Sequence, residues 1–83
     1  MKIPFAKSSD KNSMRLQSIG HVQGTESRNI KVGDTLVWNF GGTENVEEIV
    51  KVTEKTISIR ISSDNNFTSV RRLNKTRLVC IAK

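Results

Sequence analysis

Short apolar runs, separated by turn residues every eight to twelve positions, fill the chain from Ile30 onward. In Thr56–Ser62 three isoleucines alternate with polar residues, so we predict a strand that turns them toward one buried face. The almost continuous apolar run Arg77–Ala82 predicts a strand that is buried on both sides or lies at a barrel seam. This spacing is typical of an all-β sandwich or barrel.

Glycine, asparagine and aspartate mark most of the breaks between these runs, because such residues accept turn geometry. We predict strands at Thr35–Phe40, Val46–Thr53, Thr56–Ser62, Phe67–Leu73 and Arg77–Ala82. The connections are Gly41-Gly42, Glu54-Lys55, a four-residue hairpin turn at Ser63–Asn66 and a single turn at Asn74–Thr76. Five short strands bury too little for a two-layer sandwich, and a barrel removes most exposed edges. The sequence therefore predicts an all-β fold, a small five-stranded barrel over residues 29–83.

The first 28 residues have a different composition. They are rich in Lys, Ser, Asn, Gln and Gly, with thinly scattered apolar residues, so they bury too little to offset the entropy of ordering. We predict a flexible basic arm over residues 1–28. Within it, Met14–Ile19 alternates apolar and polar residues and could add an edge strand.

The run Ile30–Trp38 reads Ile-Lys-Val-Gly-Asp-Thr-Leu-Val-Trp, and a one-turn link at Leu73–Thr76 precedes the last apolar strand. With the hairpin between them, these features resemble the SH3-like barrels of the KOW and Tudor kind, over Ile30–Ala82. The resemblance implies nucleic-acid binding, peptide binding or an assembly role. One enzyme family with such a barrel, the plasmid-borne type II dihydrofolate reductases, carries a Val-Gln-Ile-Tyr strand motif. Here the alternating strand begins Ile57-Ser58-Ile59-Arg60 and the chain has no tyrosine, which favours a binding module over an enzyme.

Few residues of this chain could carry out catalysis or bind a metal. His21 is the only histidine and lies in the predicted arm, while Cys80 lies within a strand and is expected to be a buried apolar side chain. We therefore expect no catalytic residue, no metal, no cofactor and no small-molecule substrate. A single cysteine, the absence of a secretory leader and the absence of a long apolar run predict a cytoplasmic protein without a membrane partner.

Positive charge is abundant and unevenly distributed. The net charge of +6 favours polyanionic partners, and no acidic residue follows Asp64. Glu44, Glu47 and Glu48 lie near the start of the second strand; Glu47 and Glu48 should point to opposite faces, as solvated edge charges. Such one-sided positive charge is typical of a phosphate-binding surface. The candidate phosphate contacts are Arg60, Arg71, Arg72, Lys75 and Arg77.

Two aromatic residues are candidates for stacking on bases, and each has an alternative role. A four-residue turn would place Ile59 opposite Val70 and leave Phe67 and Arg71 facing outward, as in a stacking surface for single-stranded nucleic acid. A β-bulge would instead bury Phe67, and Trp38, in register with Leu36, would join the core. Burial is the favoured interpretation for both.

The first functional hypothesis is a small basic module that binds nucleic acid, DNA or RNA, or associates with it, by contacting phosphates without sequence specificity. The alternative is a protein-interaction module that docks a peptide or an acidic protein surface, including an inhibitor of a host protein or nucleoprotein complex. The small size suits an origin in a phage or another mobile element.

Overall fold

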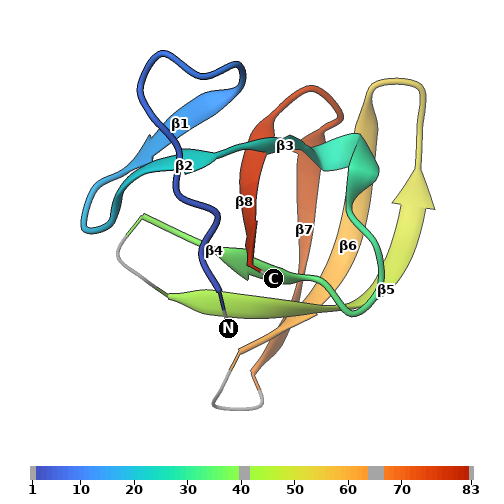
Figure 1. The fold of residues 1–83 in the computed structure, drawn as a ribbon. Helices are drawn as coiled ribbons and strands as arrows, with labels where there is room; N and C mark the ends of the chain where they lie inside the picture. The colour runs from blue at the N-terminus through green and yellow to red at the C-terminus, as the bar shows by residue number, and fades with distance from the viewer. Residues whose placement is uncertain (1, 40–41, 64–66, 83) are drawn as a thin grey trace.

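Period-two alternation produces strands over most of the chain. The structure, a computed structural model, describes residues 2–39, 42–63 and 67–82, so predictions for Phe40, Gly41 and most of the Ser63–Asn66 turn lie outside the described residues. The elements are β1 (Ser13–Leu16), β2 (Gly20–Gln23), β3 (Thr25–Glu26), a 3-10 turn η1 (Ser27–Asn29), β4 (Thr35–Val37), β5 (Thr43–Val52), β6 (Thr56–Ser62), β7 (Thr68–Asn74) and β8 (Leu78–Ala82) (Figure 1). The prediction of an all-β fold is confirmed.

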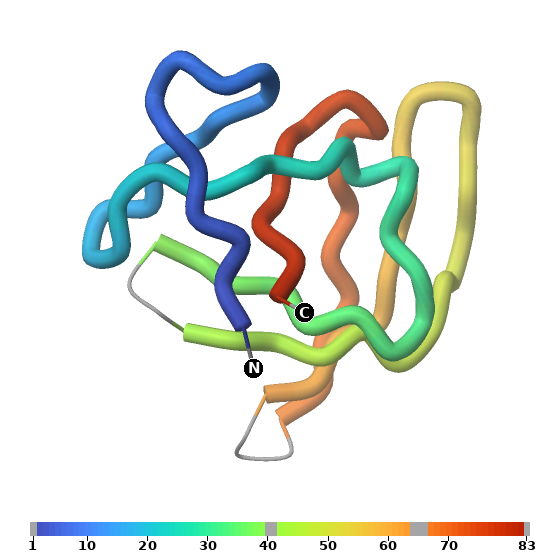
Figure 2. Tube along the Cα trace, viewed as in Figure 1, coloured from blue at the N-terminus to red at the C-terminus, as the bar shows by residue number. Residues whose placement is uncertain are grey.

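The strands form two antiparallel sheets. The hairpin β1-β2 is one, and the other has six strands in the order β3-β8-β4-β5-β6-β7. β5 is long and has two irregularities of register; its first residues, Thr43–Asn45, pair with β4, and the strand pairs with β6 from Asn45 to Val52 as it bends (Figure 2). The five predicted strands correspond to β4 to β8.

The prediction of a closed five-stranded barrel is not met. The described residues form eight strands, and the two ends of the larger sheet, β3 and β7, do not pair with each other. Strand β8 pairs with β4 along Cys80–Ala82 and with β3 at Leu78 and Val79, whereas β7 pairs with β6, so the sheet does not close through β7 and β8.

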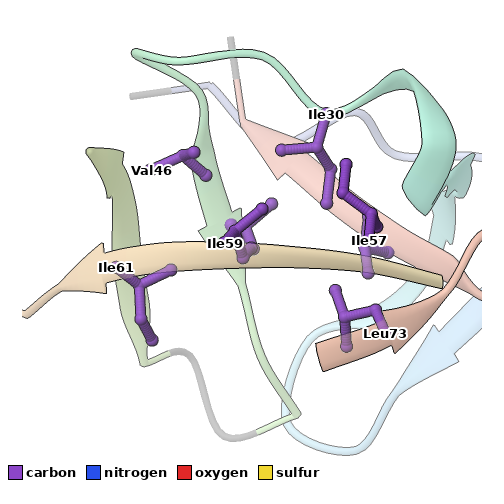
Figure 3. Close-up of a cluster of buried hydrophobic side chains, with 8 residues drawn as sticks. Ile30, Val46, Ile57, Ile59, Ile61 and Leu73 are labelled. Atoms are coloured by element: carbon purple, nitrogen blue, oxygen red, sulfur yellow. The ribbon is translucent and has the colours of Figure 1, made fainter. Parts of the chain in front are cut away.

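The main core lies on one face of the bent sheet. Ile57, Ile59 and Ile61 are buried together on β6, which confirms the predicted inward face (Figure 3). The buried members of this cluster are Ile30, Leu36, Val46, Ile57, Ile59, Ile61, Leu73 and Val79. Fully burying one such aliphatic side chain stabilises a fold by about 1.5–3 kcal/mol, so this face dominates the stability of a chain this small.

A second cluster occupies the opposite face of β4 and β8. Leu16 from β1 and Val22 from β2 pack there against Val37 and Cys80. The consecutive residues Val79 and Cys80 therefore face different cores, and both are buried. The prediction that the last strand is buried on both sides is confirmed.

The N-terminal segment differs from the expected flexible arm. Residues 13–26 form β1, β2 and β3, and Leu16 and Val22 are almost completely buried. The segment before β1 lies against β2, where the Gln23 amide donates to the Pro4 carbonyl at 2.7 Å. Few apolar residues suffice here because the hairpin does not build its own core; it covers an apolar face that β4 and β8 already present.

Glycine at position 24 allows the crossing from β2 to β3. A Cβ atom there would lie 2.7 Å from the Asn12 carbonyl oxygen and 3.1 Å from the Leu78 Cβ. Glycine is needed because two backbone segments and a side chain converge at this point.

The register of β6 and β7 is shifted by one residue from the predicted one. Ser62 pairs with Thr68, so Ile59 lies opposite Arg71 rather than Val70. The connection is one residue longer than a four-residue turn, and a one-residue slip exchanges the two faces of a strand. Arg71 consequently shares the face of the isoleucines, whereas Val70, predicted to face inward, is exposed.

We expect Leu16→Ala to lower the free energy of unfolding by about 2–5 kcal/mol, because the truncation leaves a cavity between the hairpin and β8. Arg15→Ala, at an exposed neighbouring position of the same strand, should change it by less than about 0.5 kcal/mol. Urea unfolding followed by tryptophan fluorescence measures both. Equal, negligible losses would show that the N-terminal segment is the flexible arm that its composition predicts.

Candidate anion-binding site

The five predicted phosphate contacts are divided by the sheet. Arg60 and Arg72 lie on the outer face, whereas Arg71 lies on the core-facing side. Lys75 and Arg77 belong to the turn between β7 and β8. A single surface made of all five is therefore not present.

Arg60 is paired with an acid on the outer face. Its guanidinium donates to the Glu48 carboxylate, and the neighbouring Glu47 accepts a hydrogen bond from the Ser62 hydroxyl. The expectation that Glu47 and Glu48 point to opposite faces is wrong, because the β5 ladder is irregular between Val46 and Glu48 and both carboxylates reach the same face of β6. Arg60 therefore adds little net charge to a phosphate-binding surface.

Arg71 is also engaged within the protein. Its Nε and Nη2 atoms donate to the two oxygens of Glu44 at 2.8 and 3.3 Å, and the Glu44 side chain is only 15% exposed. The guanidinium carbon of Arg71 lies 5.0 Å from the centre of the Trp38 ring, and that of Arg77 lies 5.8 Å away. These contacts fix Arg71 as part of the structure that covers the core.

The two candidate stacking residues have opposite environments. Trp38 is partly buried and packs against the main core, and its indole N–H has no acceptor among the described residues. Phe67 is 74% exposed, so the favoured prediction of its burial is wrong. The guanidinium groups of Arg71 and Arg77 lie over the Trp38 ring. Of the two candidate stacking residues, only Phe67 therefore has a ring that is accessible to a base.

A different group of basic residues surrounds a depression of about 350 Å³. Three segments that are distant in sequence meet there: η1, the turn between β5 and β6, and the turn between β7 and β8. The lining residues are Arg28, Glu54, Lys55, Asn74, Lys75 and Thr76. In Figures 1 and 2 both turns reach the same end of the sheet, with η1 between them. Of the predicted contacts, Lys75 alone belongs to this site.

Backbone hydrogen bonds hold the three segments together. The Lys75 amide donates to the Lys55 carbonyl at 2.9 Å, and the Arg28 amide donates to the Lys75 carbonyl at 3.1 Å. Ser27, which is fully buried, donates from both its amide and its hydroxyl to the Arg77 carbonyl, each at 2.8 Å. The backbone segments that carry Arg28, Lys55 and Lys75 are thus held together by hydrogen bonds.

The turn between β5 and β6 is closed by two threonines. The Thr53 amide donates to the Thr56 carbonyl at 2.9 Å, and the Thr56 amide donates to the Thr53 hydroxyl at 3.0 Å. The two hydroxyl oxygens lie 2.6 Å apart. Side chains that bond the local backbone in this way stabilise a turn, so Lys55 is carried by a defined loop.

The charges around this depression are unbalanced. Arg28, Lys55 and Lys75 face one lining acid, Glu54. Arg28 also contacts Glu26 at 3.3 Å, but Lys55 and Lys75 have no ion pair in the ranges that the structure describes. Bringing like charges together is unfavourable, and a bound anion relieves the repulsion.

Sequence reasoning missed Arg28 and Lys55. Arg28 was assigned to the flexible arm, and Lys55 belongs to a turn with one acidic and one basic residue. Only the pairing of β3 with β8 places Arg28 beside Lys75, and no local pattern predicts a pairing between segments so far apart. Lys55 could have been considered because it lies in a short hairpin connection, next to the most clearly predicted strand, Thr56–Ser62.

The remaining chemistry is limited. Cys80 is buried, and burial raises the pKa of its thiol, so the reactive thiolate is disfavoured. In the described part of the chain, no cluster of three His, Cys, Asp or Glu side chains could hold a metal ion. None of the described helical segments has the length and apolar character needed to cross a membrane.

Comparison of the chain with models of protein families, with characterised proteins and with solved structures finds no match.

We expect Arg71→Ala to lower the free energy of unfolding by about 1–3 kcal/mol, because it leaves the largely buried Glu44 without its partner and uncovers Trp38. Arg72→Ala removes the same charge from an exposed position of the same strand and should change stability by less than about 0.5 kcal/mol. Thermal unfolding at a fixed pH compares them. An equal effect of both substitutions would show that Arg71 is an ordinary surface residue.

Proposed function

We propose that this protein binds nucleic acid, DNA or RNA, by contacting phosphates at the depression between η1 and the two turns. The observation that supports this proposal is the convergence of Arg28, Lys55 and Lys75 from three separate segments around a depression with one lining acid. Phosphate oxygens accept hydrogen bonds from guanidinium and ammonium groups, and they supply the missing negative charge.

The contacts should be independent of base sequence. The depression is lined by charged groups and short polar side chains, Asn74 and Thr76, and has no aromatic lining residue on which a base could stack. Phosphate contacts orient a nucleic acid without reading its sequence. The overall charge of +6 adds a long-range attraction that raises the rate of encounter.

The surroundings of the depression extend its positive charge in one direction. On the outer face, Lys51 and Arg72 lie on either side of Ser58 in the paired strands. The next row toward the hairpin tip contains the Arg60–Glu48 pair, which is close to neutral. We therefore expect a short binding site centred on the depression.

We further propose that Ile30–Ala82 is related to the SH3-like barrels. The arrangement of β4 to β8 supports this: four consecutive antiparallel strands are followed by a fifth that returns to the first. A nucleic-acid-binding role in the cytoplasm agrees with the expected function of such a module.

We expect Lys55→Ala combined with Lys75→Ala to weaken the binding of every oligonucleotide by a similar factor. The slope of log K against log salt should fall by about two, because two cations no longer release counterions from phosphates. Fluorescence anisotropy with labelled DNA and RNA at several salt concentrations measures this. The melting temperature should stay close to that of the wild type, since Lys55 is exposed and Lys75 is only partly buried.

The matched control removes two lysines elsewhere, Lys7→Ala with Lys11→Ala, from the exposed loop before β1. It changes the net charge equally. An equal loss in both double variants would mean that the attraction is diffuse and the depression is not the site. Absence of binding at low salt would replace the proposal with the protein-interaction module, including an inhibitor of a nucleoprotein complex.

A further inference from the structure

Strand β7 has one open edge. It pairs with β6 over its full length and ends the six-stranded order, and no other described strand pairs with it. Thr68–Arg72 are all exposed, whereas the far end is covered where η1 bonds to Lys75. The opposite edge of the sheet, β3, has only two residues. β7 is therefore the edge with room for an added strand, which would pair with its free backbone groups.

The side chains on this edge differ between the two faces. Thr68, Val70 and Arg72 alternate onto the outer face, while Arg71 points to the core-facing side and is bonded to Glu44. Val70 is 57% exposed, and the adjoining Phe67 is 74% exposed. Exposed apolar side chains beside an open strand edge are typical of surfaces that bind a partner.

Two rows of the outer face end at β7. The row that passes through Arg60 contains the pair with Glu48 and ends at Val70, so it is balanced in charge and apolar at the edge. The next row runs from Lys51 through Ser58 to Arg72 and contains no acid. An added strand would extend both rows. An apolar residue would then lie beside Val70 and an acidic residue beside Arg72.

We propose that the β7 edge binds an extended peptide that adds a strand to the sheet. On the outer face of the sheet, the peptide places an acidic residue beside Arg72 and an apolar residue, two positions away, beside Val70. Backbone hydrogen bonds supply general affinity, and the side chains beside Val70 and Arg72 supply selectivity. Spacing by two is required because alternate residues of a strand share a face.

A second copy of this chain is a poor occupant. β7 contains two arginines and no acid, so pairing two copies would bring four arginines together. Glu44 compensates Arg71 in each copy, but Arg72 has no ion pair among the described residues. Like charges on paired strands are destabilising, so the edge selects an acidic partner and rejects its own copy.

The first experiment uses a capped peptide with the central sequence Thr-Thr-Glu-Thr-Val-Thr-Thr, titrated into the isotopically labelled full-length protein. We expect amide shifts concentrated on Thr68–Arg72. Arg72→Glu should weaken binding roughly tenfold, and replacing the glutamate of the peptide with lysine should restore it. Lys7→Glu, the same charge change far from β7, should leave binding unchanged. Equal effects of the two variants, or shifts elsewhere, would overturn the proposal.

The second experiment tests strand addition directly. N-methylation of alternate peptide amides removes donors from one edge of the peptide at a time. One of the two methylated peptides should lose binding and the other should keep it, since only one edge faces β7. Equal binding of both would rule out strand addition. A concentration-dependent dimer with protected β7 amides would show that a second copy occupies the edge. Lys55→Ala with Lys75→Ala should retain peptide binding, which separates this proposal from nucleic-acid binding.

Discussion

The structure depends on the burial of β8 from both sides. Val79 faces the main core and Cys80 faces the cluster beneath the N-terminal hairpin, while β4 and β3 pair with the two edges of the strand. Its neighbour β4 has the same double role, since Leu36 faces the main core and Val37 faces the second cluster. The hairpin β1-β2 needs the apolar face of β8 to cover, and η1 reaches the turn before β8 because β3 is paired with that strand.

The sequence predicted those parts of the fold that depend on local alternation. The bounds of β6 and the burial of its three isoleucines follow from period-two spacing. Strand β1 overlaps the possible edge strand at Met14–Ile19, but β2 and β3 could not be predicted in this way, because Leu16 and Val22 pack against a surface that distant residues provide. The register of β7 was also predicted wrongly, because one extra residue in the connection exchanges Val70 and Arg71 between the two faces of the sheet. Local sequence preferences do not fix the length of a connection to within one residue.

The candidate site shows the same limit. A run of basic residues in the sequence suggested one surface, but neighbouring residues on a strand point to opposite faces, and acids from β5 neutralise Arg60 and Arg71. Lys75 was predicted as part of that run, and it belongs to the site because its turn position is free of that alternation. Its companions, Arg28 and Lys55, come from segments whose proximity is set by backbone bonds between turns. Charge composition therefore identified basic candidates but did not predict which of them lie together.

The attachment of Ser27 to the Arg77 carbonyl has a thermodynamic consequence. Through it, the segment that carries Arg28 is fixed to the turn that carries Lys75, so the site is complete only while η1 and β3 remain docked. A ligand that contacts both sides binds the docked state alone and shifts the equilibrium away from local detachment. Binding at the site and docking of η1 and β3 are then thermodynamically linked. The free energy by which docking favours binding equals the free energy by which binding favours docking.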